Sequence, residues 1–335
     1  GYPVDDLDVR LLADPRQIDF KPDVVHLHSI WNRYVHAMAV YCRQHGIPYV
    51  FSPHGTLTKK ALMYKWWKKI PAMLLYQYID LLKAKGFHLT TESEVDGVRR
   101  LHLRQPVTVA PLGVSISDRI ESVRSKDVLF LGRIHPIKGL VELLHAWKSV
   151  VREGWRLLIA GPDDIGYQAE LVSLCGELRL KCADLSGSFE YGKKQIFGGG
   201  EVSASAYAEA LTELSADVVF LGSVYGEAKS WLYRHARLFV LPSHSENFGV
   251  VVLEAMAEGT PVIATRGTPW QVLEECGCGW WVEQAGLVDA LSRGMELSES
   301  EYAKMSSSCR QLVIESYSWD SVGMKLIELY EGVTG

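Results

Sequence analysis

The alternation of short apolar runs with longer helical segments is the feature of this sequence that most restricts its fold. Runs such as Val128–Gly132, Arg156–Gly161 and Val218–Gly222 are apolar along nearly their whole length, and helical stretches separate most of them. Strands of a parallel sheet have such near-continuous apolar sequences, because the connecting helices cover both faces of the sheet. The pattern predicts an α/β protein built from doubly wound parallel sheets.

The predicted strands fall into two groups on either side of the polar stretch Ser115–Lys126. We therefore expect two domains, at 1–118 and 119–316, followed by a C-terminal helix within 317–335. The segment 182–206 contains the run Gly198–Gly200 and is predicted to be an irregular loop; such a run can also cradle a phosphate, but no clear strand precedes it. The predicted strands are Asp23–Ser29, Tyr49–Ser52, Phe87–Thr91, Val107–Pro111, Val128–Gly132, Arg156–Gly161, Val218–Gly222, Leu238–Pro242, Pro261–Thr265 and Gly279–Glu283.

The first domain is predicted to be incomplete. A nucleotide-binding α/β domain normally opens with a strand and a glycine-rich turn. This chain begins at Gly1 and has no such opening, and its first part contains fewer predicted strands than its second. We expect that N-terminal strands are missing.

Charge and composition narrow the function. The net charge of −5 is shared unevenly: residues 1–120 hold 16 Lys and Arg against 11 Asp and Glu, and the remainder holds 19 against 29. This balance argues against nucleic acid as a partner but allows the basic first domain to meet an anionic surface. The six cysteines lack metal-ligand spacing, so reduced thiols in a cytoplasmic protein are expected. No apolar run is long enough to cross a membrane.

Two glutamates flank the start of an apolar helix. Glu246 stands before Asn247-Phe248-Gly249, and Glu254 lies inside the apolar run that follows. An ionised carboxylate is costly to bury without partners, so Glu254 is predicted to face a cleft where a ligand supplies hydrogen-bond donors. Carboxylates beside a helix N-terminus suit a ligand with hydroxyls to hold and phosphates to neutralise. A nucleotide sugar has both.

A second motif joins a strand, a turn and a helix at residues 128–140. Gly132 lets the backbone approach a ligand, and the cations Arg133 and Lys138 flank the start of the next helix. A diphosphate there would meet two positive charges and a helix dipole. The alternative is that both cations are solvated turn residues.

These motifs and several others, taken in order, resemble the retaining glycosyltransferases of the large group 1 family (family 4), which have the GT-B fold. The resemblance implies two Rossmann-like domains that face a cleft, with the C-terminal helix packing back on the first domain. It covers the chain from about Asp23 to its end. The matching stretches are Asp23-Val-Val-His-Leu-His, Ser52-Pro-His-Gly, Pro111-Leu-Gly-Val, Gly132-Arg133 with Lys138-Gly139, Ala160-Gly161-Pro162, Leu241 to Glu254, Gly267-Thr-Pro-Trp and Gly277-Cys-Gly-Trp-Trp.

The resemblance also implies a role for each site residue. The donor diphosphate is bound by Arg133 and Lys138 beside Gly132. The ribose hydroxyls are bound by Glu254. The transferred sugar is bound by Glu246, with the amides of Asn247, Phe248 and Gly249 beside it. Glu246 and His54 are the candidate catalytic residues, His54 facing the sugar or the acceptor from the first domain; the alternative is a satisfied turn histidine.

The reaction implied is hexosyl transfer with retention to a saccharide or lipid-linked acceptor, in cell-surface polysaccharide or lipopolysaccharide biosynthesis. Arg133, Lys138 and a helix N-terminus would stabilise the departing diphosphate, so no cofactor and no divalent metal are expected. Whether the departing phosphate takes the acceptor's proton or an enzyme nucleophile intervenes stays open. The alternative function is an inactive fragment that only binds nucleotide or nucleotide sugar. A dinucleotide-dependent oxidoreductase needs a G-x-G-x-x-G turn, which is lacking.

The segment Lys59–Lys69 combines lysines with Trp66 and Trp67. Basic amphipathic helices with tryptophan bind anionic membrane surfaces, where a lipid-linked acceptor would be presented. A peripheral location at the inner face of the cell membrane is therefore expected. The alternative is a domain helix with solvated lysines.

Overall fold

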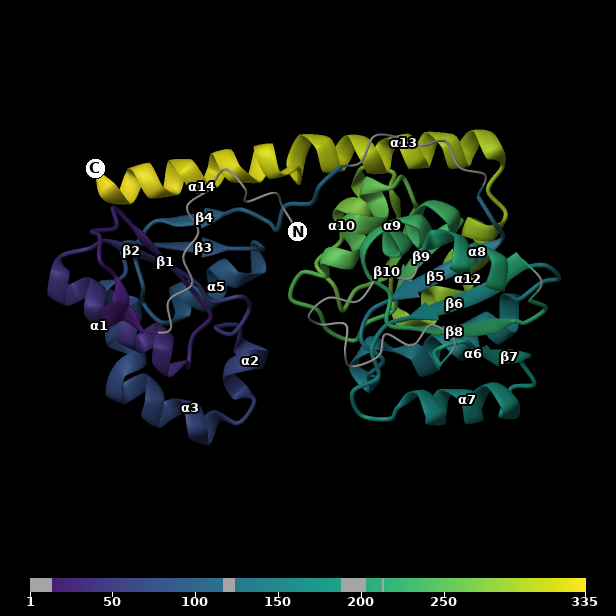
Figure 1. Ribbon diagram of the computed structural model, residues 1–335, viewed down its shortest axis with the longest axis horizontal. Coiled ribbons are helices and arrows are strands. Elements are labelled where there is room, and N and C mark those ends of the chain that lie inside the picture. The colour runs from purple at the N-terminus through teal and green to yellow at the C-terminus, as the bar shows by residue number, and fades with distance from the viewer. Residues whose placement is uncertain (1–13, 117–123, 188–202, 213) are drawn as a thin grey trace. The chain divides into compact units, whose positions relative to one another are not determined.

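The computed structural model describes residues 14–116, 124–187, 203–212 and 214–335. It divides into two compact units, one formed by Gly1–Leu112 with Val322–Gly335 and the other by Gly113–Ser321. Each unit contains one sheet, and all pairings of its strands are parallel (Figure 1). The predicted class of two parallel α/β sheets is confirmed.

The first unit has a four-stranded sheet in the order β1-β2-β3-β4. Its strands are β1 (Val25–His28), β2 (Tyr49–Ser52), β3 (Gly86–Leu89) and β4 (Val107–Val109). Its helices are α1 (Arg33–His45), α2 (Lys59–Met63), α3 (Trp66–Ala72), the π-helical turn Met73–Gln77, α4 (Tyr78–Lys83), α5 (Ser93–Arg100) and most of α14 (Trp319–Thr334). The central strands β2 and β3 are buried at every position, as near-continuous apolar runs predict.

Helix α14 packs against the sheet of the first unit. The Cα of Gly86 in β3 faces this helix, because a Cβ there would come within 3.1 Å of the Leu329 side chain and 3.4 Å of the Val333 side chain. A hydrogen bond of 2.6 Å joins the Tyr330 hydroxyl to His26 of β1. Residues of α14, far along the chain, therefore pack against the strands of the first unit.

The second unit has a seven-stranded sheet in the order β11-β10-β9-β5-β6-β8-β7. Its strands are β5 (Asp127–Leu131), β6 (Arg156–Ala160), β7 (Cys182–Asp184), β8 (Val218–Gly222), β9 (Leu238–Leu241), β10 (Val262–Thr265) and β11 (Gly279–Val282). Its helices are α6 (Leu140–Val150), α7 (Gln168–Glu177), α8 (Ala204–Thr212), α9 (Gly226–His235), α10 (Val250–Ala257), α11 (Val272–Glu275), α12 (Leu287–Met295) and α13 (Glu299–Ser316).

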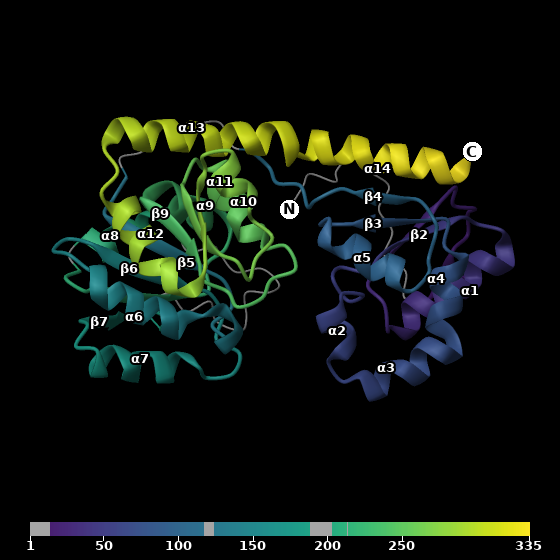
Figure 2. The ribbon, with the colours of Figure 1, turned by 180° about the vertical axis from the view of Figure 1, so that it is seen from behind.

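The sheet of the second unit changes winding direction at β5. Helices α6, α7 and α12 pack together on one face, and α9, α10 and α13 pack together on the other (Figures 1 and 2). The chain thus leaves β5 toward one face and leaves its neighbour β9 toward the opposite face. The carboxyl ends of two such strands form the crevice where ligands bind in open α/β sheets.

One prediction about this unit is wrong. The segment 182–206 was expected to be irregular, but residues 182–184 form β7, which pairs with β8, and residues from Ala204 onward form α8. The strand is short, half-exposed and ends in Asp184, so its sequence lacks the apolar run that marks the other strands. The run Gly198–Gly200 lies outside the described residues.

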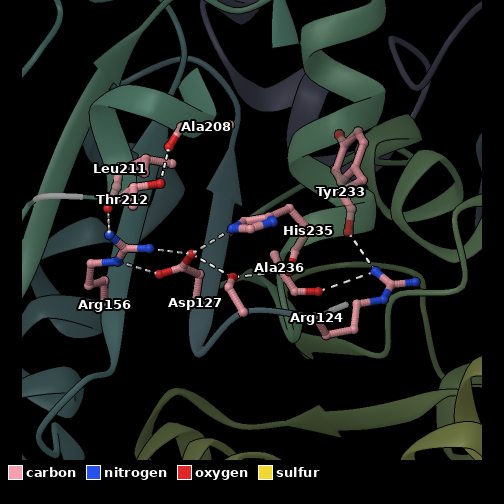
Figure 3. Close-up of polar contacts among 10 residues, drawn as sticks. Arg124, Asp127, Arg156, Ala208, Leu211, Thr212, Tyr233, His235 and Ala236 are labelled. Carbon is pink, nitrogen blue, oxygen red and sulfur yellow. Dashed lines mark hydrogen bonds and ion pairs between the residues drawn. The ribbon is translucent and has the colours of Figure 1, made fainter. Parts of the chain in front are cut away.

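A buried ion pair fastens the amino ends of two central strands (Figure 3). Asp127 begins β5 with its side chain fully buried, and it accepts hydrogen bonds from Nε and Nη2 of Arg156 at 2.7 and 2.9 Å. The Ser125 hydroxyl donates to the same carboxylate at 2.6 Å, and Nε2 of His235 lies 3.6 Å from it. Each buried charge therefore has a partner, which is the condition for tolerating it.

None of the helices in the described part of the chain is long and apolar enough to span a bilayer.

Candidate donor-binding site in the second unit

The loops that follow β5 and β9 meet at the carboxyl edge of the sheet. The backbone N–H of His244 donates to the carbonyl of Ile137 at 2.9 Å, and the Gln284 amide donates to the carbonyl of Pro242 at 2.6 Å. Gly139 ends the short 3₁₀ turn Pro136–Lys138 with φ +69°, and a Cβ there would collide with the Pro242 carbonyl oxygen. Glycine is therefore required where the two loops touch.

Lys138 and Glu246 form an ion pair across these loops. The ammonium of Lys138 contacts Oε1 of Glu246, and only 16% and 15% of the two side chains are exposed. The Ser243 hydroxyl donates to the same carboxylate oxygen at 3.0 Å, and the Glu246 N–H donates to the Gly267 carbonyl at 2.9 Å. The structure thus brings together the cation predicted to bind a diphosphate and the carboxylate predicted to bind a sugar.

Glu254 lies in α10, as the sequence predicts, but the chain itself supplies its partners. The Lys229 ammonium donates to Oε1 at 2.6 Å, and the Tyr233 hydroxyl donates to Oε2 at 2.9 Å. Lys229 and Tyr233 lie four residues apart in α9, so they share one face of that helix. Burial and the neighbouring Glu254 carboxylate raise the pKa of the Tyr233 hydroxyl well above its ordinary value. Tyr233 therefore stays a hydrogen-bond donor at neutral pH.

Aromatic packing fixes the loop between the two glutamates. Phe248 is buried, its ring lies 5.2 Å from the Trp270 ring, and its carbonyl accepts from the Trp270 indole at 2.6 Å. Gly249 has φ +82° and directly precedes α10. Asn247, Phe248 and Gly249 thus lie at the N-terminus of α10, where the helix dipole and the backbone N–H groups of a helix favour an anion or a sugar oxygen.

The two remaining predicted residues lie apart from these contacts. Arg133 follows Gly132 after β5, its side chain is exposed, and it makes no hydrogen bond or ion pair with any residue in the described ranges. His54 belongs to the first unit, where it follows β2 with φ +48° and is half-buried. The Nε2 atom of His54 lies 2.9 Å from Nδ1 of His28, with the two rings stacked.

The sequence analysis missed three polar partners of the glutamates: Lys229, Tyr233 and Ser243. The four-residue spacing of Lys229 and Tyr233 was the one signal that could have placed them on a common face. The described residues contain no group of three or more His, Cys, Asp or Glu side chains that could hold a metal ion.

Two parallel α/β units, the second with a switch point between β5 and β9, are the architecture of the GT-B class of glycosyltransferases. Solved structures of that class match the chain. The Anabaena protein HepE, in complex with UDP and glucose, has a TM-score of 0.68 and 16% identity over 92% of this chain and 78% of that one. Sucrose-phosphate synthase from Thermosynechococcus elongatus has a TM-score of 0.66 and 20% identity over 92% of this chain and 73% of that one.

The sequence comparisons specify the family. Residues 117–315 match the model of the glycosyl transferases group 1, and residues 3–113 match a glycosyl transferase 4-like domain. The chain therefore belongs to the group 1 glycosyl transferases, and the resemblance seen in the motifs is confirmed. An uncharacterized glycosyltransferase of Methanocaldococcus jannaschii is 26% identical over 93% of this chain and 75% of that protein. A GDP-mannose-dependent α-mannosyltransferase of Corynebacterium glutamicum is 24% identical over 94% of this chain and 68% of that protein.

Proposed function

We propose that this protein transfers a sugar, with retention, from a nucleotide-diphosphate-sugar donor to a saccharide or lipid-linked acceptor. The observation that carries the proposal is the contact between Lys138 and Glu246 at the switch point of the second sheet. A cation for phosphate and a carboxylate for hydroxyls stand side by side there. Glu254 is the fifth residue of α10, the helix that begins at this loop.

Each group in the site has a distinct task in this proposal. Arg133 and Lys138 bind the diphosphate, and the exposed guanidinium of Arg133 suits bidentate contact with it. Glu254 accepts hydrogen bonds from the two ribose hydroxyls, while the hydrogen bond from Lys229 holds its carboxylate in place. Glu246 accepts from hydroxyls of the transferred sugar. The amides at the start of α10 hold the remaining oxygens.

The charges also suit the transition state. Breaking the anomeric bond leaves negative charge on the departing diphosphate and positive charge on the sugar. Lys138 and Arg133 stabilise the first, and the Glu246 carboxylate stabilises the second. Two protein cations replace the divalent ion that many phosphate sites use, so we expect transfer to continue in the presence of a chelator.

The comparisons support a nucleotide sugar without selecting its base. The structure of HepE contains UDP and glucose, and the mannosyltransferase relative depends on GDP-mannose. Calorimetric titration with UDP, GDP and ADP tests the donor site. Binding of one nucleotide supports the proposal, and binding of none by a folded chain contradicts it. A turnover assay with the selected donor then separates a transferase from a protein that only binds the nucleotide sugar.

The acceptor side of the proposal rests on an exposed apolar surface of the first unit. This surface runs from α2 to the π-helical turn η2 (Met73–Gln77), and we call it the α2–η2 surface. Its exposed side chains include Trp66 and Trp67, at 56% and 57%, and Leu74 and Leu75, both at 76%. Side chains so apolar rarely stay in water unless they meet a partner. The basic residues among them, Lys65, Lys68 and Lys69, favour an anionic membrane.

We therefore propose that the α2–η2 surface binds the cytoplasmic membrane face, where a lipid-linked acceptor of cell-surface polysaccharide synthesis is presented. A solved relative, WaaG, is involved in lipopolysaccharide biosynthesis, with a TM-score of 0.60 and 15% identity over 90% of this chain and 82% of that one. Co-sedimentation with anionic liposomes tests this. Replacing Leu74 and Leu75 with glutamate should abolish binding, while Val172→Glu, at an exposed apolar residue of α7, serves as the control. Failure of the wild type to sediment with anionic liposomes contradicts the proposal.

A further inference from the structure

The first unit contains a chain of hydrogen bonds through the half-buried His26 and the buried His88, which the donor site does not use. The Tyr330 hydroxyl lies 2.6 Å from Nδ1 of His26, and Nε2 of His26 lies 2.6 Å from the Ser52 hydroxyl. The Ser52 hydroxyl also lies 2.6 Å from Nδ1 of His88, whose Nε2 lies 2.7 Å from the Ala110 carbonyl oxygen. We call these four side chains the histidine chain.

The Ala110 carbonyl fixes the direction of every bond in the histidine chain. A carbonyl only accepts, so Nε2 of His88 carries the proton, and the neutral ring then accepts at Nδ1. Ser52 therefore donates to His88 and accepts from Nε2–H of His26. The remaining nitrogen of His26, Nδ1, accepts from the Tyr330 hydroxyl. Both histidines are thus neutral Nε2–H tautomers with both nitrogens occupied.

The surroundings keep these rings uncharged. Burial lowers the pKa of His26 to about 3, with help from the neighbouring His28, His88 and His54 rings. Burial also lowers the pKa of His88, and the Ala110 carbonyl and the Glu94 carboxylate only partly oppose it. A proton taken up in this region therefore does not settle on the histidine chain.

A second pair of imidazoles, His28 and His54, lies beside the neutral histidine chain. The His28 ring stacks on the His26 ring at 4.2 Å, and Nδ1 of His28 lies 2.9 Å from Nε2 of His54. Two facing nitrogens can share only one proton, so one ring donates and the other accepts. In the described part of the chain no partner is found for the outer nitrogens, Nδ1 of His54 and Nε2 of His28. With both rings neutral, the pair presents one donor and one acceptor at these two atoms, whichever ring donates.

We propose that His28 is a positioning residue for His54, and that the two rings together bind the hydroxyls of a sugar through one N–H and one lone pair. A hydroxyl both donates and accepts, so it matches such a pair in either proton arrangement. The His26 ring of the histidine chain holds His28 in place by stacking on it. The hydrogen bond between Tyr330 and His26 connects helix α14 to the same support. The inference rests on the proposed function for its ligand but not for its geometry.

The geometry is tested by nitrogen-detected proton correlation spectra of protein with ¹⁵N-labelled histidine, since ring nitrogen shifts report the tautomer. We expect His26 and His88 to appear as neutral Nε2–H tautomers throughout a titration from about pH 8 to about pH 5.5. Tyr330→Phe should shift Nδ1 of His26, and His28→Ala should shift Nε2 of His54. His145→Ala, at an exposed residue of α6, should change neither. A Nδ1–H or charged His88 overturns the inference, and so does a His54 signal that ignores the loss of His28.

The ligand is tested by transfer kinetics with a matched donor and acceptor. His28→Ala should lower kcat/KM for the acceptor about tenfold, the effect of one lost hydrogen bond, with nucleotide affinity unchanged. His28→Asn places an amide near the position of Nδ1 and should restore most of the loss. Equal activity of Ala and wild type, or equal impairment of Ala and Asn, overturns the positioning role. A chain without any transfer activity contradicts the proposed function instead, and the spectra still decide the geometry.

Discussion

Replacing Glu254 with glutamine isolates the charge of the proposed ribose-binding carboxylate. In the structure this carboxylate accepts from Lys229 at 2.6 Å and from Tyr233 at 2.9 Å, with 21% of its side chain exposed. Glutamine has nearly the same shape and its amide oxygen can still accept from Tyr233. The variant therefore removes the negative charge while it leaves the packing of α9 against α10 in place.

The expected loss of nucleotide affinity follows from the hydrogen bonds that the carboxylate would make. A hydrogen bond to a charged group contributes about 1.5–3 kcal/mol, which corresponds to about a ten- to hundredfold increase in Kd. The effect on folding should be smaller, about 1 kcal/mol or less, because Lys229 is 29% exposed and can turn to water. Binding should thus suffer far more than stability.

Glu254→Ala gives a useful contrast. It leaves the hydroxyl of Tyr233, a residue only 1% exposed, without an acceptor. An unsatisfied buried hydroxyl costs about 1–3 kcal/mol, so alanine should lower the free energy of unfolding more than glutamine does. A variant that loses affinity only because it unfolds is therefore recognised by its stability.

Calorimetric titration with the nucleotide that the wild type binds, together with urea unfolding of each variant, measures both quantities. Glu274→Gln, at an exposed residue of α11, is the matched control and should bind like the wild type. The same Kd for wild type and Glu254→Gln would refute the assignment of Glu254 to the donor site.

Three further predictions concern stability. Asp127→Ala should lower the free energy of unfolding by about 3–5 kcal/mol in urea titrations, because it leaves the Arg156 guanidinium without its buried partner; a loss below about 1 kcal/mol would contradict this. Gly139→Ala should weaken nucleotide binding and stability together, because its Cβ meets the Pro242 carbonyl; wild-type behaviour in calorimetry would show that the two loops do not touch. The folded state holds the pKa of His26 at about 3 against 6.5 in the unfolded chain. Between pH 6.5 and about 3 only the unfolded state takes up this proton, so this group should lower stability with decreasing pH by about 1.4 kcal/mol per unit within that window, and His26→Gln should reduce that slope.

The fold was largely predictable because its strands carry a strong local signal. The strands β2, β3, β5 and β9 are buried at every position, so each stands out in the sequence as an apolar run. The missed strand, β7, is the edge of its sheet and has a half-exposed, partly polar sequence. Burial creates the signal that sequence analysis reads, and an edge strand of three residues has little burial.

The site was predictable only in part, for a different reason. That the loops after β5 and β9 lie at one edge follows from parallel strands alone, since all their carboxyl ends point the same way. The contact between Lys138 and Glu246 depends on β5 and β9 being neighbours in the sheet. The order of strands in a sheet cannot be read from their order along the chain. The partners of Glu254 come from α9 on the same face, which requires the helix layers to be known.

Because Lys138 pairs with Glu246, we expect Glu246→Gln to change the affinities for two related ligands in opposite directions. A nucleotide diphosphate needs the Lys138 charge, which Glu246 already neutralises in the free protein. Glu246→Gln removes this competing carboxylate, so free nucleotide diphosphate should bind more tightly, by about 1 kcal/mol or roughly fivefold, the scale of a partly exposed ion pair. The matching nucleotide sugar loses its acceptor for the sugar hydroxyls in the same variant, so its affinity should fall or stay level, and turnover should fall. Parallel calorimetric titrations with the two ligands measure the difference. If the variant weakens both equally, Glu246 acts through folding of the loop and not through contact with the sugar.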